Sequence, residues 1–146
     1  VAIDTSGANV VEGNEILSNG ASGVSVLTSN NRIGGTTAAQ RNVISGNAAD
    51  GVRVATTASG NTIEGNWIGL NTAGTAALAN NGAGVTLFSA SNTLSGNVIS
   101  GNRTHGVQIS GTSGTGNLVL GNLIGTSLTP MFLRTSSSGL PVRPSK

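Results

Sequence analysis

The chain has 146 residues, 23 of them glycine, with 8% charged residues, 2% aromatic residues and a formal net charge of +2. This length suits one domain with one elongated core, and the weak charge with its scattered basic residues excludes a nucleic-acid-binding surface. The lack of cysteine excludes disulfides and thiolate metal sites, and no run of about 18 apolar residues is present to span a membrane.

One short pattern, Asn-x-apolar-x-Gly-Asn-x-Ile, recurs along most of the chain. Copies occupy residues 9–16, 61–68, 92–99 and 117–124, and a fifth copy is split between 31–35 and 42–44. A second unit, Gly-apolar-x-apolar, occupies residues 23–26, 51–54, 84–87 and 106–109. Repeats of this length predict a solenoid, in which each repeat packs against its neighbours.

Each repeat is predicted to form one coil with three short strands. In the first repeat, residues 9–11, 14–16 and 24–26 alternate inward-facing and outward-facing positions, as strands with one buried face do. Gly13 and Asn14 mark a sharp turn between the first two strands. A coil closes in about 22 residues once two insertions, 36–41 and 70–79, are set aside. The expected fold is therefore an all-β, right-handed parallel β-helix of about five coils, since the hexapeptide period of a left-handed one is missing.

The same alternation predicts ladders of asparagine inside the solenoid. Stacked amides bond to their equivalents one coil away and satisfy turn backbone that would otherwise be buried without partners. We therefore interpret these asparagines as structural and not as ligands. The first ladder comprises Asn9, Asn31, Asn61, Asn92 and Asn117. The second ladder comprises Asn14, Asn42, Asn66, Asn97 and Asn122.

One outward row is unexpectedly apolar, and we call it the apolar row. It comprises Glu15, Val43, Trp67, Val98 and Leu123. An apolar stripe of this kind is seldom left in contact with water. Either the two insertions fold over it, or identical chains pack through Val43, Trp67, Val98 and Leu123 as a homo-oligomer. A sugar-stacking role for Trp67 is a weaker alternative, because carbohydrate grooves usually offer several aromatic side chains.

Candidate catalytic groups are few. Glu12 and Glu64 share an outward row with Gly34 between them, which predicts a separation of roughly 9 to 10 Å, the outer limit for the carboxylate pair of an inverting glycosidase. His105 is the only histidine and the only candidate general base near neutral pH. Asp50 lies in its row but two coils away, too far to orient the imidazole. The alternative interpretation is that Glu12, Glu64 and His105 are solvated surface residues. No metal or other cofactor is predicted.

Residues 42–47, Asn-Val-Ile-Ser-Gly-Asn, and residues 65–69 and 121–125, Gly-Asn-x-Ile-Gly, carry a family resemblance. They resemble repeats of right-handed parallel β-helix proteins that bacteria secrete or display, the pectate-lyase-like solenoid superfamily. The resemblance covers residues 9 to about 126. It implies an extracellular or cell-surface location and polysaccharide as a partner. The same scaffold carries polysaccharide lyases, glycosidases, epimerases, adhesins and plain spacers, so the fold does not specify the function.

Residues 1–126 are thus expected to form the repeat domain, and residues 127–146 either a degenerate last coil or an atypical tail. The predicted function is a non-catalytic structural or glycan-binding module of a secreted bacterial protein that associates with itself. The alternatives are a polysaccharide-active enzyme, either a glycoside hydrolase or a lyase, and an ester hydrolase organised around His105.

Overall fold

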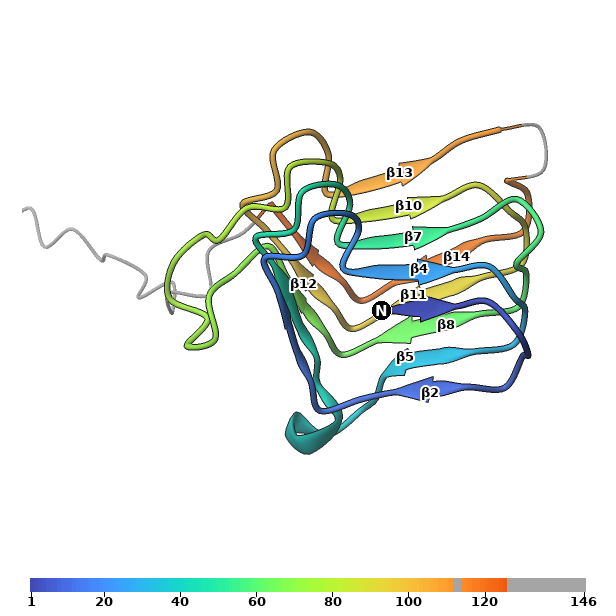
Figure 1. Ribbon diagram of the computed structural model, residues 1–146, viewed down its shortest axis with the longest axis horizontal. Helices are drawn as coiled ribbons and strands as arrows, with labels where there is room; N and C mark the ends of the chain where they lie inside the picture. The colour runs from blue at the N-terminus through green and yellow to red at the C-terminus, as the bar shows by residue number, and fades with distance from the viewer. Residues whose placement is uncertain (112–113, 126–146) are drawn as a thin grey trace, which may run out of the picture.

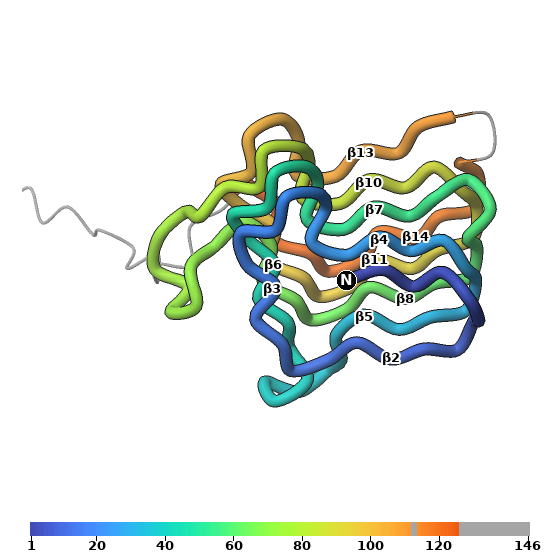
Figure 2. The backbone as a smooth tube through the Cα atoms, viewed as in Figure 1, coloured from blue at the N-terminus to red at the C-terminus, as the bar shows by residue number. Residues whose placement is uncertain are grey.

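A computed structural model describes residues 1–111 and 114–125 of the chain. In these ranges the chain is all-β, apart from one short 3₁₀ helix. Its strands stack as three parallel sheets of five strands each, along one axis (Figure 1). Tracing the chain shows about five coils, each passing through all three sheets (Figure 2). The predicted parallel β-helix is confirmed.

Every coil contributes one strand of two or three residues to each sheet. Sheet A contains β1 (Ala2–Ile3), β4 (Val24–Val26), β7 (Val52–Val54), β10 (Val85–Leu87) and β13 (Val107–Ile109). Sheet B contains β2 (Val10–Val11), β5 (Arg32–Gly34), β8 (Thr62–Glu64), β11 (Thr93–Ser95) and β14 (Leu118–Leu120). Sheet C contains β3 (Glu15–Leu17), β6 (Val43–Ser45), β9 (Trp67–Ile68), β12 (Val98–Ile99) and β15 (Leu123–Ile124).

The strand register superimposes equivalent residues of successive coils. Ile33 pairs with Ile63, and Ile63 pairs with Leu94. These three side chains are completely buried, and the inward rows of sheets A and C meet them in one continuous core. Burying an aliphatic side chain of this size contributes about 1.5 to 3 kcal/mol. The core is therefore a stack of Val, Ile and Leu layers, one layer per coil.

Gly65 shows why the turn between sheets B and C requires glycine. Its φ is 66°, in the left-handed region that side chains with a Cβ rarely adopt. A Cβ built there would lie 2.0 Å from the carbonyl oxygen of Gly35, on the neighbouring coil. This turn therefore requires glycine for two reasons: the positive φ and the close approach of the neighbouring coil.

The two insertions leave the stack at different places. The first carries the 3₁₀ helix η1 (Ala38–Gln40). The second, residues 70–79, projects from the corner next to sheet C as the loop coloured green in Figure 1. Leu70 pairs with Ala77 across it as an antiparallel bridge, and the side chain of Asn71 accepts hydrogen bonds from the main-chain N–H groups of Thr75 and Ala76 at 2.8 and 3.2 Å. Both segments are thus ordered by local hydrogen bonds.

Strand β1 was not predicted. Residues 2–3 pair with β4 and bury Ile3 in the core. The register makes Val1 the equivalent of Val24, so the position equivalent to Gly23 precedes the first residue given and the Gly-apolar-x-apolar unit was not recognised here. Among the residues that the structure covers, no helix combines the length and apolarity needed to cross a membrane. The predicted tail, residues 127–146, lies outside the described residues.

Candidate functional site

The first predicted asparagine ladder is present and continuous. Nδ2 of Asn31 donates to Oδ1 of Asn61 at 2.9 Å, and Nδ2 of Asn61 donates to Oδ1 of Asn92 at 3.0 Å. Asn9 and Asn117 complete this ladder at its two ends. The main-chain N–H of Asn61 also donates to Oδ1 of Asn92. Each amide thus satisfies turn backbone, as a structural role requires.

A ladder of the same kind stands at each of the other two turns. The second predicted ladder is confirmed by side-chain hydrogen bonds from Asn14 through to Asn122. A third ladder, which the sequence analysis missed, links Asn19, Asn47, Asn80 and Asn102. Its signal was an asparagine three residues after each of Ile16, Ile44 and Ile99. The second insertion lies between Ile68 and Asn80, so Asn80 does not follow Ile68 by three residues and the pattern was interrupted.

Glu12 and Glu64 stand in one row, but their environments differ. Glu12 lies in a surface ion pair, with its Oε2 2.7 Å from Nη2 of Arg32, and it also accepts a hydrogen bond from Gln40 at 3.2 Å. Glu64 is half-buried on β8, beside Gly34 in the register. Gly34 therefore separates the two carboxylates, as expected. No contact joins them within the described ranges, and their catalytic role stays a prediction.

Glu64 lines a shallow depression of about 250 Å³. Its other lining residues are Thr36, Gly65, Ser95 and Gly96. Thr36 comes from the first insertion and Ser95 from β11, so the depression is formed by three successive coils. The lining residues carry two hydroxyl groups and one carboxylate, while most of the lining surface is apolar.

His105 is exposed at the turn before sheet A. Its main-chain oxygen accepts a hydrogen bond from Gly84 at 2.9 Å. The carboxylate of Asp50 is occupied elsewhere, because it accepts a hydrogen bond from the N–H of Ala83 at 2.9 Å and lies 3.8 Å from Arg53. No hydrogen bond joins the imidazole to a serine or a carboxylate in the part of the chain that the structure covers. A Ser-His-Asp arrangement is therefore not assembled there.

The apolar row is partly covered by the chain itself. The register places Trp67 between Val43 and Val98, and both valines are buried while Leu123 at the end of the row is exposed. The guanidinium of Arg41, the last residue of the first insertion, lies 4.3 Å from the centre of the indole ring. The first insertion therefore covers Trp67 as one interpretation expected. The second insertion instead pairs with the backbone of Gly46 and Gly69 at the adjacent corner.

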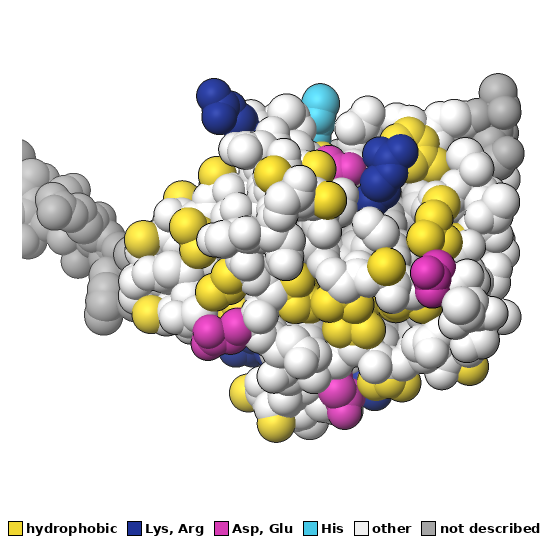
Figure 3. Space-filling view, viewed as in Figure 1, with side chains coloured by type: hydrophobic (Ala, Val, Ile, Leu, Met, Phe, Trp, Pro, Cys, Tyr) yellow, Lys and Arg dark blue, Asp and Glu magenta, His cyan; other side chains and the backbone are white. Residues whose placement is uncertain are grey.

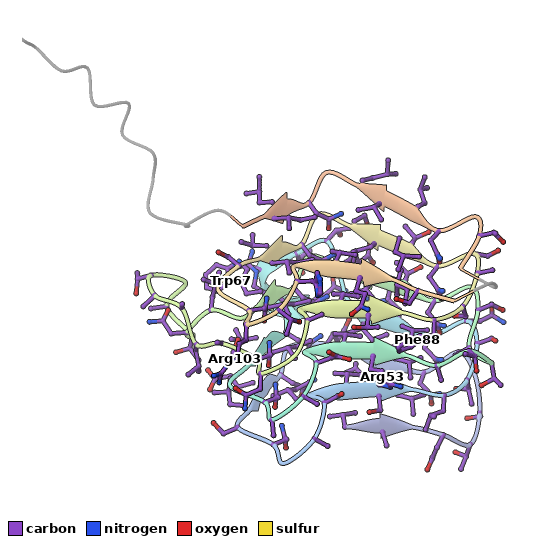
Figure 4. All side chains as sticks on the ribbon, turned by 90° about the horizontal axis from the view of Figure 1, so that it is seen from above. Arg53, Trp67, Phe88 and Arg103 are labelled. Atoms are coloured by element: carbon purple, nitrogen blue, oxygen red, sulfur yellow. The ribbon has the colours of Figure 1, made fainter. Side chains whose placement is uncertain are left out.

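A second cation–π pair lies on the outer side of sheet A. The guanidinium of Arg53 is 4.5 Å from the centre of the Phe88 ring, away from Trp67 (Figure 4). Between the strand positions of Arg53 and Gln108, Thr86 is buried, and its hydroxyl has no hydrogen-bond partner among the residues that the structure describes. The sequence analysis did not predict this pair, because Phe88 follows the repeat unit and lies outside its pattern.

Ionisable groups are dispersed over the surface. Figure 3 shows the acidic side chains on one face as separate patches. Within residues 1–111 and 114–125, no group of three or more His, Cys, Asp or Glu side chains could hold a metal ion.

With this geometry in place, the chain was compared with known protein families. Residues 1–124 match the model described as "right handed beta helix region". The chain belongs to the right-handed β-helix family. Comparison of this β-helix with curated proteins and with solved structures gives no match. Family membership thus agrees with the stacked parallel sheets and with the predicted handedness.

Proposed function

We propose that this β-helix is a non-catalytic structural module of a secreted bacterial protein. The observation that supports this role is the set of three continuous asparagine ladders around an aliphatic core. Turn asparagines of successive coils donate hydrogen bonds to their equivalents on the next coil. A scaffold of this kind is stiff along its axis and presents repeated outward rows at a spacing of about 4.8 Å.

The dispersal of reactive groups supports the same role. General acid–base chemistry needs side chains within hydrogen-bond reach of the reacting atoms and of each other. Glu12 is engaged by Arg32, Asp50 by Ala83 and Arg53, and His105 is a single exposed side chain.

The test is a panel of chromogenic sugar and ester substrates. It is run with the parent chain, Glu64→Gln and His105→Ala. We expect no turnover above the blank for any of the three. Turnover in the parent chain that one variant abolishes would refute the non-catalytic role, and would support the polysaccharide-active enzyme if the variant is Glu64→Gln or the ester hydrolase if it is His105→Ala.

A second candidate function is glycan binding in the depression at Glu64. The carboxylate of Glu64 and the hydroxyl groups of Thr36 and Ser95 are suited to hydrogen-bond the hydroxyl groups of a sugar. Trp67 lies two residues beyond Gly65, which also lines the depression, and Arg41 covers one face of its ring. The ligand would therefore combine hydrogen bonds to these groups with apolar contacts to the rest of the lining.

Isothermal titration with plant and bacterial oligosaccharides tests this second candidate. Glu64→Gln is expected to weaken binding about tenfold or more, because hydrogen bonds to a charged group contribute about 1.5 to 3 kcal/mol. Glu12→Gln is the matched control, since Glu12 shares the row but lies outside the depression. Equal affinity for both variants would exclude the depression as the binding site.

A further inference from the structure

The depression at Glu64 holds a carboxylate that has no partner in the described part of the chain. Glu12 is paired with Arg32, and Asp50 lies close to Arg53. Glu64 is half-buried, but within the ranges that the structure covers no hydrogen bond or ion pair engages its side chain. A charge that is partly withdrawn from water is stabilised by an opposite charge or by hydrogen-bond donors. This carboxylate is therefore suited to a ligand that supplies both.

Arg32 and Arg41, on the coil before Glu64, are bound elsewhere. A guanidinium nitrogen of Arg32 lies 2.7 Å from the carboxylate of Glu12. The guanidinium of Arg41 lies 4.3 Å from the centre of the Trp67 ring, and its Nε donates to a main-chain oxygen at 3.3 Å. Neither side chain lines the depression. The carboxylate of Glu64 thus stays available to a ligand.

The lining of the depression offers acceptors more than donors. The main-chain N–H groups of Gly65 and Gly96 both donate to carbonyl oxygens one coil further along, at 3.1 Å each. An ionised carboxylate only accepts hydrogen bonds, whereas a hydroxyl group accepts and donates. The side chains of Glu64, Thr36 and Ser95 therefore supply acceptors, and neither glycine has a spare N–H for an anion. A primary ammonium group brings three donors together with its positive charge.

The size and the lining of the depression favour a sugar ring over a lysine side chain. Its volume of about 250 Å³ lies just below the range of about 300 to 1,000 Å³ for pockets that enclose a drug-sized ligand. A pyranose combines apolar C–H groups with hydroxyl groups, as this lining combines apolar surface with the hydroxyl groups of Thr36 and Ser95. A lysine side chain carries its charge on methylene groups alone and would leave both hydroxyl groups unused.

We infer that this depression binds an amino sugar, with the ammonium group of the ligand on the carboxylate of Glu64 and its hydroxyl groups on Thr36 and Ser95. The inference rests on the second candidate function, glycan binding, and names the class of glycan. The lining comes only from the coils of β5, β8 and β11, each with a neighbour on both sides, so the site is complete within the stack. An acidic glycan is excluded, because its carboxylate and that of Glu64 would repel each other.

A matched series of tetrasaccharides tests the inference by isothermal titration. Cellotetraose, the tetramer of N-acetylglucosamine and the tetramer of glucosamine share one backbone and differ only in a hydroxyl, acetamide or ammonium group on each ring. At mildly acidic pH, where the sugar amine is protonated, we expect the glucosamine tetramer to bind at least about tenfold more tightly than the other two, because charge-assisted hydrogen bonds are the stronger ones. Equal affinity of the parent chain for all three would overturn the inference.

Two pairs of variants locate the ammonium group. Glu64→Gln should abolish the preference for the glucosamine tetramer, whereas Glu12→Gln, in the same row but outside the depression, should retain it. Thr36→Lys places an ammonium group in the wall of the depression and should weaken binding of this tetramer at least about tenfold through like-charge repulsion. Ala38→Lys is its control, since it adds the same charge at an exposed position outside the lining.

Circular dichroism confirms that each variant folds, and if Glu64→Gln does not, the lysine pair decides. The formal net charge of +2 disfavours non-specific attraction of a cationic sugar. A preference that survives Glu64→Gln, or equal weakening by Thr36→Lys and Ala38→Lys, would overturn the inference.

The pH dependence gives an independent measurement. Raising the pH above the pKa of the sugar amine removes the charge of the ligand, so the affinity for the glucosamine tetramer should fall to that for cellotetraose, which should not change. A short peptide with one lysine that binds more tightly than the glucosamine tetramer would overturn the assignment to a sugar. Equal binding of all three tetramers that depends on Glu64 would remove the amino-sugar inference and leave glycan binding standing, whereas no binding of any tetramer would remove both.

Discussion

The substitution Asn66→Ala should measure what the ladders contribute to stability. Asn66 is completely buried in the centre of the second ladder. Its Oδ1 accepts hydrogen bonds from the N–H and Nδ2 of Asn42 at 3.2 and 2.9 Å. Its Nδ2 donates to the carbonyl oxygens of Ile33 and Glu64 and to Oδ1 of Asn97, at 2.9 to 3.0 Å. Alanine removes all of these bonds, with no water to replace them.

The expected loss follows from the groups left behind. A buried N–H without an acceptor, here that of Asn42, costs about 1 to 3 kcal/mol, and each further lost bond about 0.5 to 1.5 kcal/mol. We therefore expect Asn66→Ala to lower the free energy of unfolding by at least about 3 kcal/mol. Asn14→Ala is the matched control at the exposed end of the same ladder, where only donor bonds to Glu12 and Asn42 are lost. Water replaces them, so the expected cost is about 1 kcal/mol.

Urea unfolding followed by circular dichroism gives the two free energies. A difference of about 2 kcal/mol or more is a large part of the total stability of about 5 to 15 kcal/mol usual for a domain. Equal losses of unfolding free energy for Asn66→Ala and Asn14→Ala would refute the reasoning, because burial of the interior amide would then not increase the energy that its hydrogen bonds contribute.

Three other substitutions have defined outcomes. Gly65→Ala should destabilise more than Gly96→Ala by about 1 kcal/mol or more in thermal melts, because φ is positive at both positions, 66° and 62°, but an added Cβ meets backbone only at Gly65. Arg41→Ala should lower stability by about 0.5 to 1 kcal/mol and shift the fluorescence emission of Trp67 to longer wavelength, since the indole face becomes wet. Ile63→Ala should cost about 2 to 5 kcal/mol in urea unfolding through the cavity that it leaves in the core.

Each of these substitutions has its own control. Arg103 is exposed and Trp67 is the only tryptophan, so Arg103→Ala should leave the emission unchanged. A shift equal to that of Arg41→Ala would contradict the cation–π contact. Ile109→Ala should cost clearly less than Ile63→Ala, because Ile109 is already exposed on the terminal coil. Identical melting temperatures for the two glycine variants would exclude the steric contact at Gly65.

The repeat itself was readable from the sequence, because its causes are local and recur. Alternation of apolar and polar residues decided which side chains face inward, and the stacking of Ile33, Ile63 and Leu94 follows from it. Asparagine at a constant offset from these positions predicted two ladders in their correct register. Each interior amide bonds to its equivalents in the two neighbouring coils, so a constant spacing was sufficient to place the ladders.

Other features depended on the packing of segments that do not repeat. The contact of Arg41 with Trp67, the hydrogen bond from Gln40 to Glu12 and the position of the second insertion involve residues outside the pattern. The exposed core at Ile124 likewise became visible only once the coils were stacked. Periodicity determines how equivalent residues of successive coils stack. Tertiary contacts decide where an insertion folds and which core side chains the last described coil leaves exposed, because no neighbouring repeat constrains these two features.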